Sequence, residues 1–570
     1  MKWDTGVKKS QNAMRLLTFI DVGVIVIVSC ALNLFGLGAC CAITDAKSGK
    51  GVRMSTKWLK DAVFYEIYPQ SFYDTNADGI GDFNGIIEKL DYIKSLGCNA
   101  LWINPCFDSP FKDAGYDVRD YKKVAPRYGC NNDLYRLFGE AHKKGIKVLL
   151  DLVPGHTSEE HEWFCMSQKA EKNEYSNRFI WTDFCFQGAK NMGFIGGESE
   201  RSGTYILNFF KCQPALNYGF WKVEEPWQLP VDHPDAIATR EAMKDVMRFW
   251  MDHGCDGFRV DMAASLVKND DEKKSGTSAI WRNVREMLDA EYPDAAMVAE
   301  WSNPPLALRA GYHMDFYLNH PGCGYATLMR DYQKSFAEVG TDNSYFKKDA
   351  ADRDIKPFLD EYCAWYKNTR DIGYISMLTC NHDTTRPRFN LGYDELKLAY
   401  AFLFTMPGVP FLYYGDEIGM RYLNLPTKEG GYYRTGSRTP MQWDGSKNLG
   451  FSTGCADALY LPVDAEADAP TVEAQDKDPG SLLNTVRALL KLRHNEEDLQ
   501  ADAEFEPVCA EKGKPFVYRR GELLLAVNPS GEALSAEVSV GSRKPLFVIG
   551  SADVAEDKLT LNAQSFVVLK

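Results

Sequence analysis

The sequence has no excess of positive charge, and its cysteines follow no regular spacing. It carries 65 Lys and Arg against 79 Asp and Glu, a net charge of -14, without a long basic run. A nucleic-acid backbone therefore has little to attract it, and we expect no nucleic-acid partner. None of the 15 cysteines form a CxxC pair. This argues against a zinc site or a disulfide framework and favours a reducing compartment.

One long apolar run contrasts with the rest of the chain. Residues 16–43 contain a single charge, Asp21, and are long enough to span a bilayer. Residues 1–53 have two interpretations: a signal peptide or membrane anchor, or a stretch that precedes a true start at Met54. We favour the second and a cytoplasmic protein, because the cysteine usage opposes export. The first interpretation predicts a membrane-anchored or exported protein.

From residue 54 onward, short apolar runs alternate with amphipathic helical patterns, which is typical of βαβ units around a parallel sheet. The expected strands cover residues 62–69, 100–105, 147–153, 257–263, 295–301, 314–318, 375–383 and 409–417. The expected helices include residues 84–97, 134–145, 235–253, 279–290, 394–406 and 481–494. Eight strands predict an α/β fold, a closed (β/α)8 barrel with its active site at the carboxyl ends of the strands.

Two other segments break this alternation. Residues 157–233 show no clear helix and are too long for a loop, so we expect an inserted small domain after the third strand. Short alternating strands follow residue 504 and predict an all-β C-terminal domain. The expected organisation is an uncertain extension (1–53), a barrel (54–156 and 234–503), an inserted domain (157–233) and a C-terminal β-sandwich (504–570).

Polar side chains end four of the expected strands. They are Asp151 and His156 on the third, Arg259 and Asp261 on the fourth, Glu300 on the fifth, and His382 and Asp383 on the seventh. Helix capping or hydrogen bonding to the backbone explains one polar residue at a strand end. The same explanation does not account for polar residues at four strand ends in one chain. Carboxylates around one cavity suit glycoside cleavage, in which one attacks, one protonates the leaving oxygen and one holds the distorted sugar.

Four segments in order, DLVPGH, GFRVD, VAEW and TCNHD, resemble the conserved regions of the α-amylase family, glycoside hydrolase family 13. The resemblance covers about residues 58–570. It implies that Asp261 is the nucleophile, Glu300 the general acid and base, and Asp383 the third carboxylate, which stabilises the transition state. It also implies that Arg259 positions the nucleophile and that His156 and His382 bind the sugar. A retaining double displacement, with carboxyls about 5 Å apart, is then expected.

Within the family, KDAGYDVRDY, QPALN and SRTPMQWD resemble the oligo-1,6-glucosidase, α-glucosidase and trehalose synthase group. This resemblance implies that Asp113 grips glucose hydroxyls, that Tyr116 stacks on the ring and that Arg438 closes the pocket. A closed pocket favours exo-action on short substrates. The alternative is that Tyr116 is a packed aromatic residue and Arg438 part of a surface ion pair.

One metal motif is readable in residues 74–82, DTNADGIGD. Asp74, Asn76, Asp78, the Ile80 carbonyl and Asp82 alternate around a glycine turn, as in an oxygen cage for a hard cation. The spacing matches the first half of an EF-hand loop, although Gly85 stands where that loop has glutamate. The alternative is a hydrated acidic turn. The same stretch holds calcium in the resembled group, so we predict structural Ca2+ and no organic cofactor.

Several positions depart from the family. Gly155 and Ala215 replace the Asn and Asp that ligate a calcium in endo-acting α-amylases, so we expect that second site to be absent. Ala264 and Ser265 replace a Lys and a His, which further disfavours starch endo-hydrolysis. Met262, after the nucleophile, matches neither residue associated with α-1,6 or α-1,4 preference.

Three functions remain as hypotheses. The first is an exo-acting α-glucosidase on short oligosaccharides or disaccharides. The second is a glucosyl transferase or isomerase, such as trehalose synthase or sucrose isomerase, that passes glucose to a sugar instead of water. The third is a non-enzymatic protein like the heavy chains of amino-acid transporters, against which the complete carboxylate triad argues. We infer no obligate protein partner.

Overall fold

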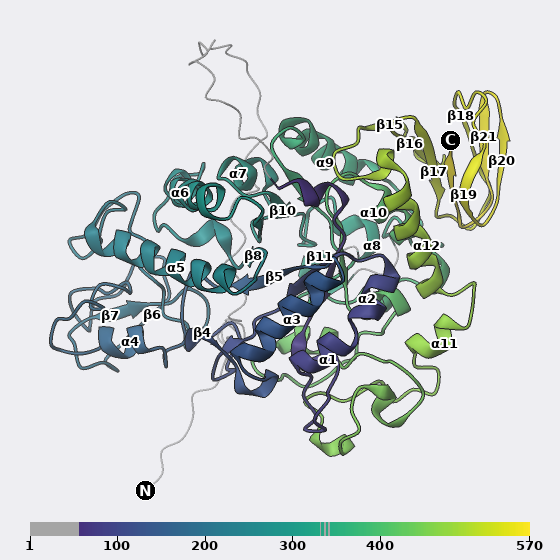
Figure 1. The fold of residues 1–570 in the computed structure, drawn as a ribbon. Helices are drawn as coiled ribbons and strands as arrows, with labels where there is room; N and C mark the ends of the chain where they lie inside the picture. Colours follow the sequence, from purple (N-terminus) through teal and green to yellow (C-terminus); the bar gives the residue numbers. More distant parts are fainter. Residues whose placement is uncertain (1–55, 331, 336–337, 340–342) are drawn as a thin grey trace, which may run out of the picture. The chain divides into compact units, whose positions relative to one another are not determined.

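The computed structural model describes residues 56–330, 332–335, 338–339 and 343–570 (Figure 1). The predictions for the N-terminal extension and for its apolar segment, residues 16–43, lie outside these ranges. Within the described ranges, no helix is both long enough and apolar enough to cross a membrane.

Eight parallel strands form the central sheet, and they correspond to the eight predicted strands. They are β1 (Phe64–Ile67), β2 (Ala100–Ile103), β5 (Lys147–Leu152), β8 (Gly257–Val260), β9 (Ala296–Ala299), β10 (Met314–Phe316), β13 (Tyr374–Ser376) and β14 (Phe411–Tyr413). The spatial order is β13-β10-β9-β8-β5-β2-β1-β14. A parallel bridge between Leu378 and Phe411 joins the two ends, so the sheet closes into the predicted barrel.

Alternate residues of each strand face opposite sides of the barrel wall, because side chains alternate along a strand. Phe64, Ala100, Trp102 and Leu149 belong to one buried cluster, with Phe316 and Phe411, and fill the barrel. Their neighbours, such as Tyr65, Leu101 and Val148, belong to a second cluster with the surrounding helices. A barrel filled in this way is a packed core and not a pore. Its active-site residues therefore lie at the carboxyl ends of the strands.

Helices surround the barrel (Figure 1). They are α1 (Phe83–Glu88), α2 (Leu90–Leu96), α3 (Asn131–Lys143), α5 (Pro234–Asp252), α6 (Ser275–Glu291), α7 (Pro304–Arg309), α8 (Ala326–Met329), α9 (Lys356–Thr369), α10 (Tyr393–Thr405), α11 (Val472–Asp476) and α12 (Leu482–Asn495). The single helix predicted for residues 84–97 is two helices separated by Lys89, whose ψ of 4° is not helical. Short strand pairs accompany them: β3 (Phe107–Asp108) with β4 (Asp120–Val124), and β11 (Tyr332–Ser335) with β12 (Glu338–Val339).

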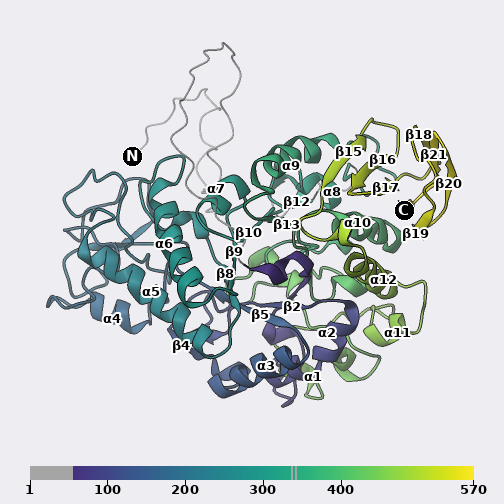
Figure 2. The same ribbon diagram turned by 45° about the horizontal axis from the view of Figure 1, so that its top comes forward.

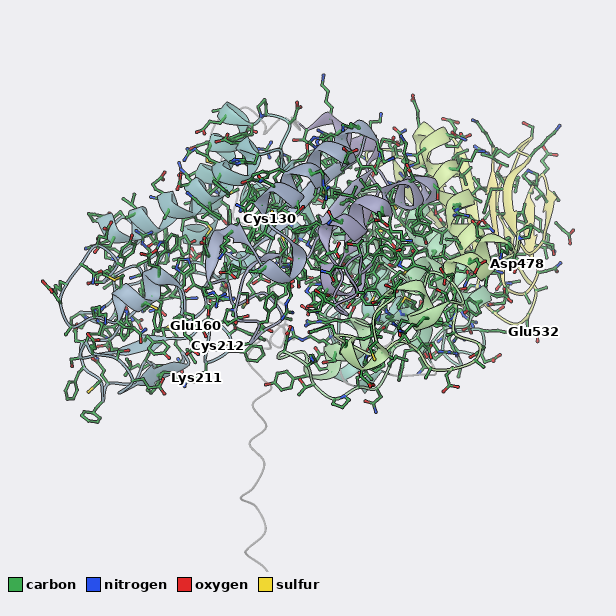
Figure 3. All side chains as sticks on the ribbon, turned by 60° about the horizontal axis from the view of Figure 1, so that its bottom comes forward. Cys130, Glu160, Lys211, Cys212, Asp478 and Glu532 are labelled. Atoms are coloured by element: carbon green, nitrogen blue, oxygen red, sulfur yellow. The ribbon has the colours of Figure 1, made fainter. Side chains whose placement is uncertain are left out.

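Between β5 and α5 the chain builds a lobe with its own buried cluster, which includes Ile180, Ile206, Phe220 and Trp227. It contains the antiparallel pair β6 (Phe194–Gly196) and β7 (Thr204–Ile206) and one short helix, α4 (Glu162–Ser167), where we expected none. The backbone N–H of Glu159 donates to the Cys212 carbonyl at 2.9 Å, which joins the first part of the lobe to a later segment of it. Figure 3 labels Cys212 and Glu160, the residue next to Glu159.

The C-terminal part is all-β, as predicted (Figure 2). A five-stranded sheet has the order β15-β16-β17-β22-β19 and a three-stranded sheet the order β18-β21-β20. The strands are β15 (Phe505–Cys509), β16 (Phe516–Arg520), β17 (Leu523–Asn528), β18 (Leu534–Glu537), β19 (Pro545–Ile549), β20 (Ala552–Ala555), β21 (Lys558–Leu561) and β22 (Ser565–Leu569). Leu524 and Val567 of one sheet share a buried cluster with Leu559 and Leu561 of the other. The Tyr518 hydroxyl lies 2.6 Å from Thr405 Oγ1, which ties these strands to α10.

Candidate active site

The Arg259 guanidinium contacts three of the predicted carboxylates at the carboxyl end of the barrel. Its Nη1 lies 2.8 Å from Asp151 Oδ1 and 3.0 Å from Asp261 Oδ1. Its Nη2 lies 2.9 Å from Glu300 Oε1. These residues come from β5, β8 and the end of β9, which are neighbouring strands. One buried cation therefore gathers the predicted nucleophile and the predicted acid.

Burial and charge set the protonation of this group. Burial raises the pKa of Asp151 to about 6, although Arg259 opposes the shift. Burial and the Glu300 carboxylate raise the pKa of Asp261, and Arg259 again opposes them. Two buried carboxylates on one guanidinium titrate as a pair. Such a pair holds a proton to higher pH than an exposed carboxylate does.

Asp383 lies between two arginines. Its Oδ1 is 2.8 Å from Arg438 Nη2 and 3.0 Å from Arg434 Nη1. Burial alone would raise the pKa of Asp383, but His382 and both arginines outweigh it and hold the pKa below its usual range. Asp383 is therefore a fixed negative charge. Arg438 was a predicted site residue, whereas Arg434 was not.

Asp113 lies in the segment between β3 and β4. Its Oδ2 accepts a hydrogen bond from Gln213 Nε2 at 2.8 Å, and its Oδ1 is 3.5 Å from Arg434 Nη2. Burial raises the pKa of Asp113 to about 6, against the effect of Arg434 and Arg438. Arg434 thus joins two of the predicted site carboxylates, Asp113 and Asp383.

Tyr116 packs on a predicted sugar-binding histidine. Its ring stacks on His382 with centroids 5.5 Å apart, and its hydroxyl donates to Asp151 Oδ2 at 3.1 Å. Behind His382, Glu66 Oε1 lies 2.8 Å and Asn104 Nδ2 lies 3.0 Å from the Nδ1 atom. Burial lowers the pKa of His382 and raises that of Glu66. Glu66 and Asn104 were not predicted, although a charged residue inside the apolar run AVFYEIYP was a visible signal.

His156 lies where the lobe joins the barrel. It pairs with Ala215 in an antiparallel bridge, and its Nδ1 is 3.0 Å from Asn208 Nδ2. A Cβ atom on Gly155 would lie 2.8 Å from that same Asn208 nitrogen. Glycine at position 155 therefore leaves room for Asn208.

An ammonium group lies at the same junction. Lys268 Nζ donates to Asn208 Oδ1 at 3.0 Å and to the Ser265 carbonyl at 2.9 Å. Burial lowers the pKa of Lys268 to about 8. Lys268 therefore contacts Asn208, which lies next to Gly155. Gly155 is one of the two positions where endo-acting α-amylases have a calcium ligand. The absence of that second calcium stays a prediction.

Met262 follows Asp261 in a left-handed conformation, with φ of 43°. Its backbone N–H donates to Glu300 Oε2 at 2.9 Å, and its sulfur lies 3.6 Å from Asn208 Nδ2. Met262 therefore links Glu300, a predicted catalytic carboxylate, to the junction with the lobe.

The predicted calcium loop is closed by its own hydrogen bonds. Asp74 Oδ1 accepts backbone N–H groups of Asn76 and Ala77, and Asp82 accepts those of Thr75 and Gly85. Asn76 and Asp78 are exposed. In the described part of the chain, no three His, Cys, Asp or Glu side chains gather as a group that could hold a metal ion. Calcium at this loop stays a prediction.

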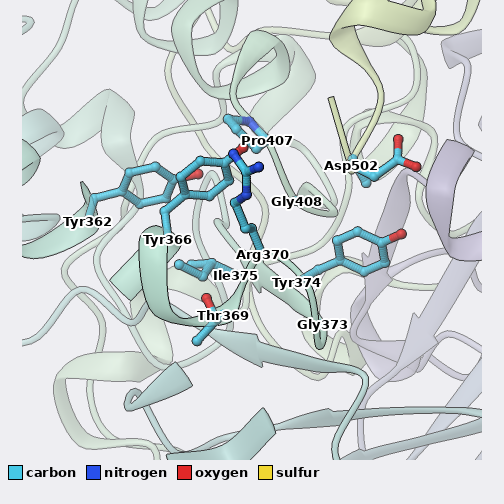
Figure 4. A pocket seen from close by; sticks show the side chains of 11 residues that line it. Tyr362, Tyr366, Thr369, Arg370, Gly373, Tyr374, Ile375, Pro407, Gly408 and Asp502 are labelled. Carbon is cyan, nitrogen blue, oxygen red and sulfur yellow. The ribbon is translucent and has the colours of Figure 1, made fainter. Parts of the chain in front are cut away.

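A shallow pocket lies away from these residues. Tyr366, Arg370, Tyr374 and Asp502 line it, at the amino end of β13 (Figure 4). Catalytic groups of such barrels lie at the opposite, carboxyl end of the strands. We assign the pocket no part in the site.

The closed barrel and the carboxylates gathered at its carboxyl end define an enzyme that acts on glycosidic bonds. A family model, the alpha amylase catalytic domain, matches residues 66–502. The chain belongs to the α-amylase family.

Its relatives include proteins named as glucosidases and as synthases of disaccharides. An oligo-1,6-glucosidase from Heyndrickxia coagulans is 32% identical over 84% of this chain and 93% of its own length. A trehalose synthase/amylase from Mycolicibacterium smegmatis is 34% identical over 77% of this chain and 76% of its own. The trehalulose synthase of Pseudomonas mesoacidophila MX-45 superposes with a TM-score of 0.75 at 26% identity, covering 90% of this chain and 99% of that one. These relatives are enzymes, which disfavours a non-enzymatic transporter subunit.

Proposed function

We propose that this enzyme acts on the terminal glucose of short α-gluco-oligosaccharides by a retaining mechanism, as an α-glucosidase or oligo-1,6-glucosidase does. The observation that carries the proposal is the contact of Arg259 with both Asp261 and Glu300. A retaining glycosidase needs a nucleophilic carboxylate and a protonated carboxyl on either side of one bond.

The chemistry follows in two displacements. An Asp261 oxygen attacks the anomeric carbon while Glu300 gives its proton to the glycosidic oxygen, so the bond breaks and the leaving sugar departs. Glu300, now a carboxylate, takes a proton from water, and the water oxygen displaces Asp261 from the anomeric carbon. Two inversions at one carbon give net retention, so the second displacement releases glucose as its α-anomer.

The other side of the site supports action on a terminal ring. Asp113, Asp383, Arg434 and Arg438 form one connected set of charges. Carboxylates and guanidinium groups are the hydrogen-bond partners that ring hydroxyls use. A pocket closed by such a set accepts the end of a chain better than its middle.

A second candidate is the transfer of glucose to a sugar hydroxyl, or isomerisation of a disaccharide. The similarity to proteins named trehalose synthase and trehalulose synthase favours it. The residues and the first displacement are the same, and only the acceptor of the second step differs.

Product analysis with maltose, isomaltose and sucrose separates the two. Glucose released first as the α-anomer supports hydrolysis, whereas a new disaccharide without net glucose supports isomerisation. If none of a broad set of α-glucosides is consumed, the proposal is wrong.

A further inference from the structure

A buried glutamate lies directly behind His382. Glu66 belongs to β1, is fully buried, and brings its Oε1 atom to 2.8 Å from His382 Nδ1. Asn104, which follows β2, lies beside both of them. Its Nδ2 atom is 3.0 Å from the same ring nitrogen and 3.1 Å from Glu66 Oε1. The two proposed displacements use neither Glu66 nor Asn104.

The imidazole ring of His382 is held in one orientation. Tyr116 and Tyr68 both stack on it, with centroids 5.5 Å and 6.0 Å from its own. Arg438 Nε donates to the backbone carbonyl of His382 at 2.9 Å, and the Tyr116 hydroxyl contacts Nε2. Because these contacts hold the ring, Nδ1 stays on the side of Glu66 and Nε2 stays on the side of Tyr116.

The number of available hydrogens places one of them on His382 Nε2. A tyrosine hydroxyl has a single hydrogen, and the Tyr116 hydroxyl lies 3.1 Å from Asp151 Oδ2. Asp151 acts as an acceptor, because Arg259 contacts its other oxygen and the Trp102 Nε1–H donates to it at 3.2 Å. The Tyr116 hydrogen therefore points to Asp151. The hydrogen between Tyr116 and His382 is then the one on Nε2.

Two protonation states of Glu66 fit beside Nδ1. A carboxylate requires a hydrogen on Nδ1, which makes His382 a charged imidazolium, whereas a carboxyl group donates its own hydrogen to a bare Nδ1. Glu66 Oε2 is buried and has no hydrogen-bond partner among the residues that the structure describes. Such an isolated oxygen costs more free energy on a carboxylate than on a neutral carboxyl group. Burial also raises the pKa of Glu66 and lowers that of His382, so the uncharged pair is favoured.

We propose that Glu66 is a protonated positioning residue for His382, whose carboxyl hydrogen holds the imidazole neutral with its own hydrogen on Nε2. The inference rests on the proposed function, which puts the terminal glucose beside Asp383. His382 Nε2 lies 3.4 Å from Asp383 Oδ2 and therefore faces that place. The hydrogen bonds then run in one direction, from Glu66 through His382 and Tyr116 to Asp151.

The direction of this chain reaches the reacting carboxylates. Asp151 shares Arg259 with Asp261, the proposed nucleophile. If the hydrogen of His382 were on Nδ1, Nε2 would accept the Tyr116 hydrogen and Asp151 would lose one of its donors. His382 would also turn a bare nitrogen toward the sugar. Glu66 thus acts through its neighbours and touches no substrate.

Nitrogen-15 NMR of protein labelled in its histidine rings tests the inference directly. At pH 7 and without substrate, the two ring nitrogens distinguish an imidazolium from each neutral form, and His382→Gln identifies the signals of His382. We expect the neutral ring with its hydrogen on Nε2. In Glu66→Gln, an amide N–H replaces the carboxyl hydrogen, so the same form should remain. Glu417→Gln is the matched control, because Glu417 is also fully buried and accepts the hydroxyls of Tyr65 and Tyr92.

Kinetics separate a positioning role from a general loss of packing. Glu66→Leu, which removes the donor, should lower kcat/KM by about 10-fold or more, whereas Glu66→Gln should lose about threefold at most. Equal losses in the two variants, or no loss in Glu66→Leu, would overturn the inference. An imidazolium, or a neutral ring with its hydrogen on Nδ1, would overturn it as well. The spectrum requires no turnover, so an enzyme inactive on α-glucosides would contradict the proposed function while the spectrum still decides on Glu66.

Discussion

Arg259 Nη1 lies 3.0 Å from Oδ1 of Asp261, the residue two positions later in the chain. Residues two apart in an extended strand project to the same side, so β8 by itself brings this cation and this carboxylate together. The same Arg259 nitrogen contacts Asp151 of the neighbouring β5. The geometry of two adjacent strands therefore builds the centre of the site.

Replacing Asp261 by Asn removes the proposed nucleophile without changing its size. We expect kcat to fall by about 10^4-fold or more, as for other removed nucleophiles. The melting temperature at pH 7 should not fall, because burial disfavours the charge that is removed. Steady-state kinetics and thermal unfolding check both. Asp245→Asn, on the exposed face of α5, is the control, and wild-type turnover in Asp261→Asn would refute the assignment.

Replacing Arg259 by Lys keeps the charge but loses the planar fork that reaches three carboxylates. We expect kcat/KM to fall by about 10^2-fold. Arg259 lowers the pKa values of Asp151 and Asp261, so weaker contacts raise them, and the acid limb of the pH profile should move to higher pH. Arg248→Lys, whose partner Glu291 lies on the surface, is the control. An acid limb that does not move contradicts this view of Arg259.

The raised pKa of Asp113 predicts a pH dependence of substrate binding. With a pKa of about 6, Asp113 becomes neutral as the pH falls below that value and loses strength as an acceptor for sugar hydroxyls. KM should therefore rise as the pH falls from 7 to 5. In Asp113→Asn, KM should already be high at pH 7 and should change little between pH 7 and 5. The acid limb of the kcat profile, to which Asp151 contributes, should remain in this variant.

The raised pKa of Asp113 also makes the stability of the folded protein depend on pH. The pKa of Asp113 is higher in the folded protein than its ordinary value of 3.8, so between about pH 4 and 6 the folded state holds more protons. Its contribution to stability therefore decreases as the pH rises through this window and stays unfavourable above it. Asp113→Asn should raise the melting temperature slightly at pH 7 and not at pH 4. A lower melting temperature at pH 7 would contradict this sign.

Calcium is predicted to stabilise the loop of residues 74–82. We expect millimolar Ca2+ to raise the melting temperature of chelator-treated protein by about 3 °C or more. Asp78→Asn should abolish the effect with little change in the metal-free protein, because Asp78 is exposed and its carboxylate hydrogen-bonds only within the loop. Equal melting temperatures with calcium and with chelator would contradict the predicted calcium site.

Most of the barrel was predictable, because buried parallel strands are short apolar runs between amphipathic helices. All eight strands were located, although the strand predicted for residues 375–383 ends earlier, as β13 (Tyr374–Ser376). The two helices α1 and α2 were predicted as one, since the apolar face of residues 84–97 continues across Lys89. The helix α4 has six residues, fewer than two turns, so no periodic pattern revealed it.

Site residues at strand ends were predictable for the same reason, and those from loops were less so. The structure brings Asp151, Arg259, Asp261 and Glu300 together, and their roles stay proposals. Arg434 was missed although it precedes Arg438 by four residues, because only contacts far apart in sequence place it on Asp113 and Asp383. Asn208 was not predicted, because it lies in the site only where the missing side chain of Gly155 leaves room for it.

The proposed mechanism requires a covalent bond between Asp261 and glucose. The most direct test is to incubate the enzyme with 5-fluoro-α-glucosyl fluoride, which forms a slowly hydrolysed glycosyl-enzyme, and to map the label by peptide mass spectrometry. We predict one fluoroglucosyl group per chain, on the peptide that contains Asp261, and none in Asp261→Asn. A label on another residue would contradict the role of Asp261, and turnover of α-glucosides with inversion at the anomeric carbon would contradict the retaining mechanism.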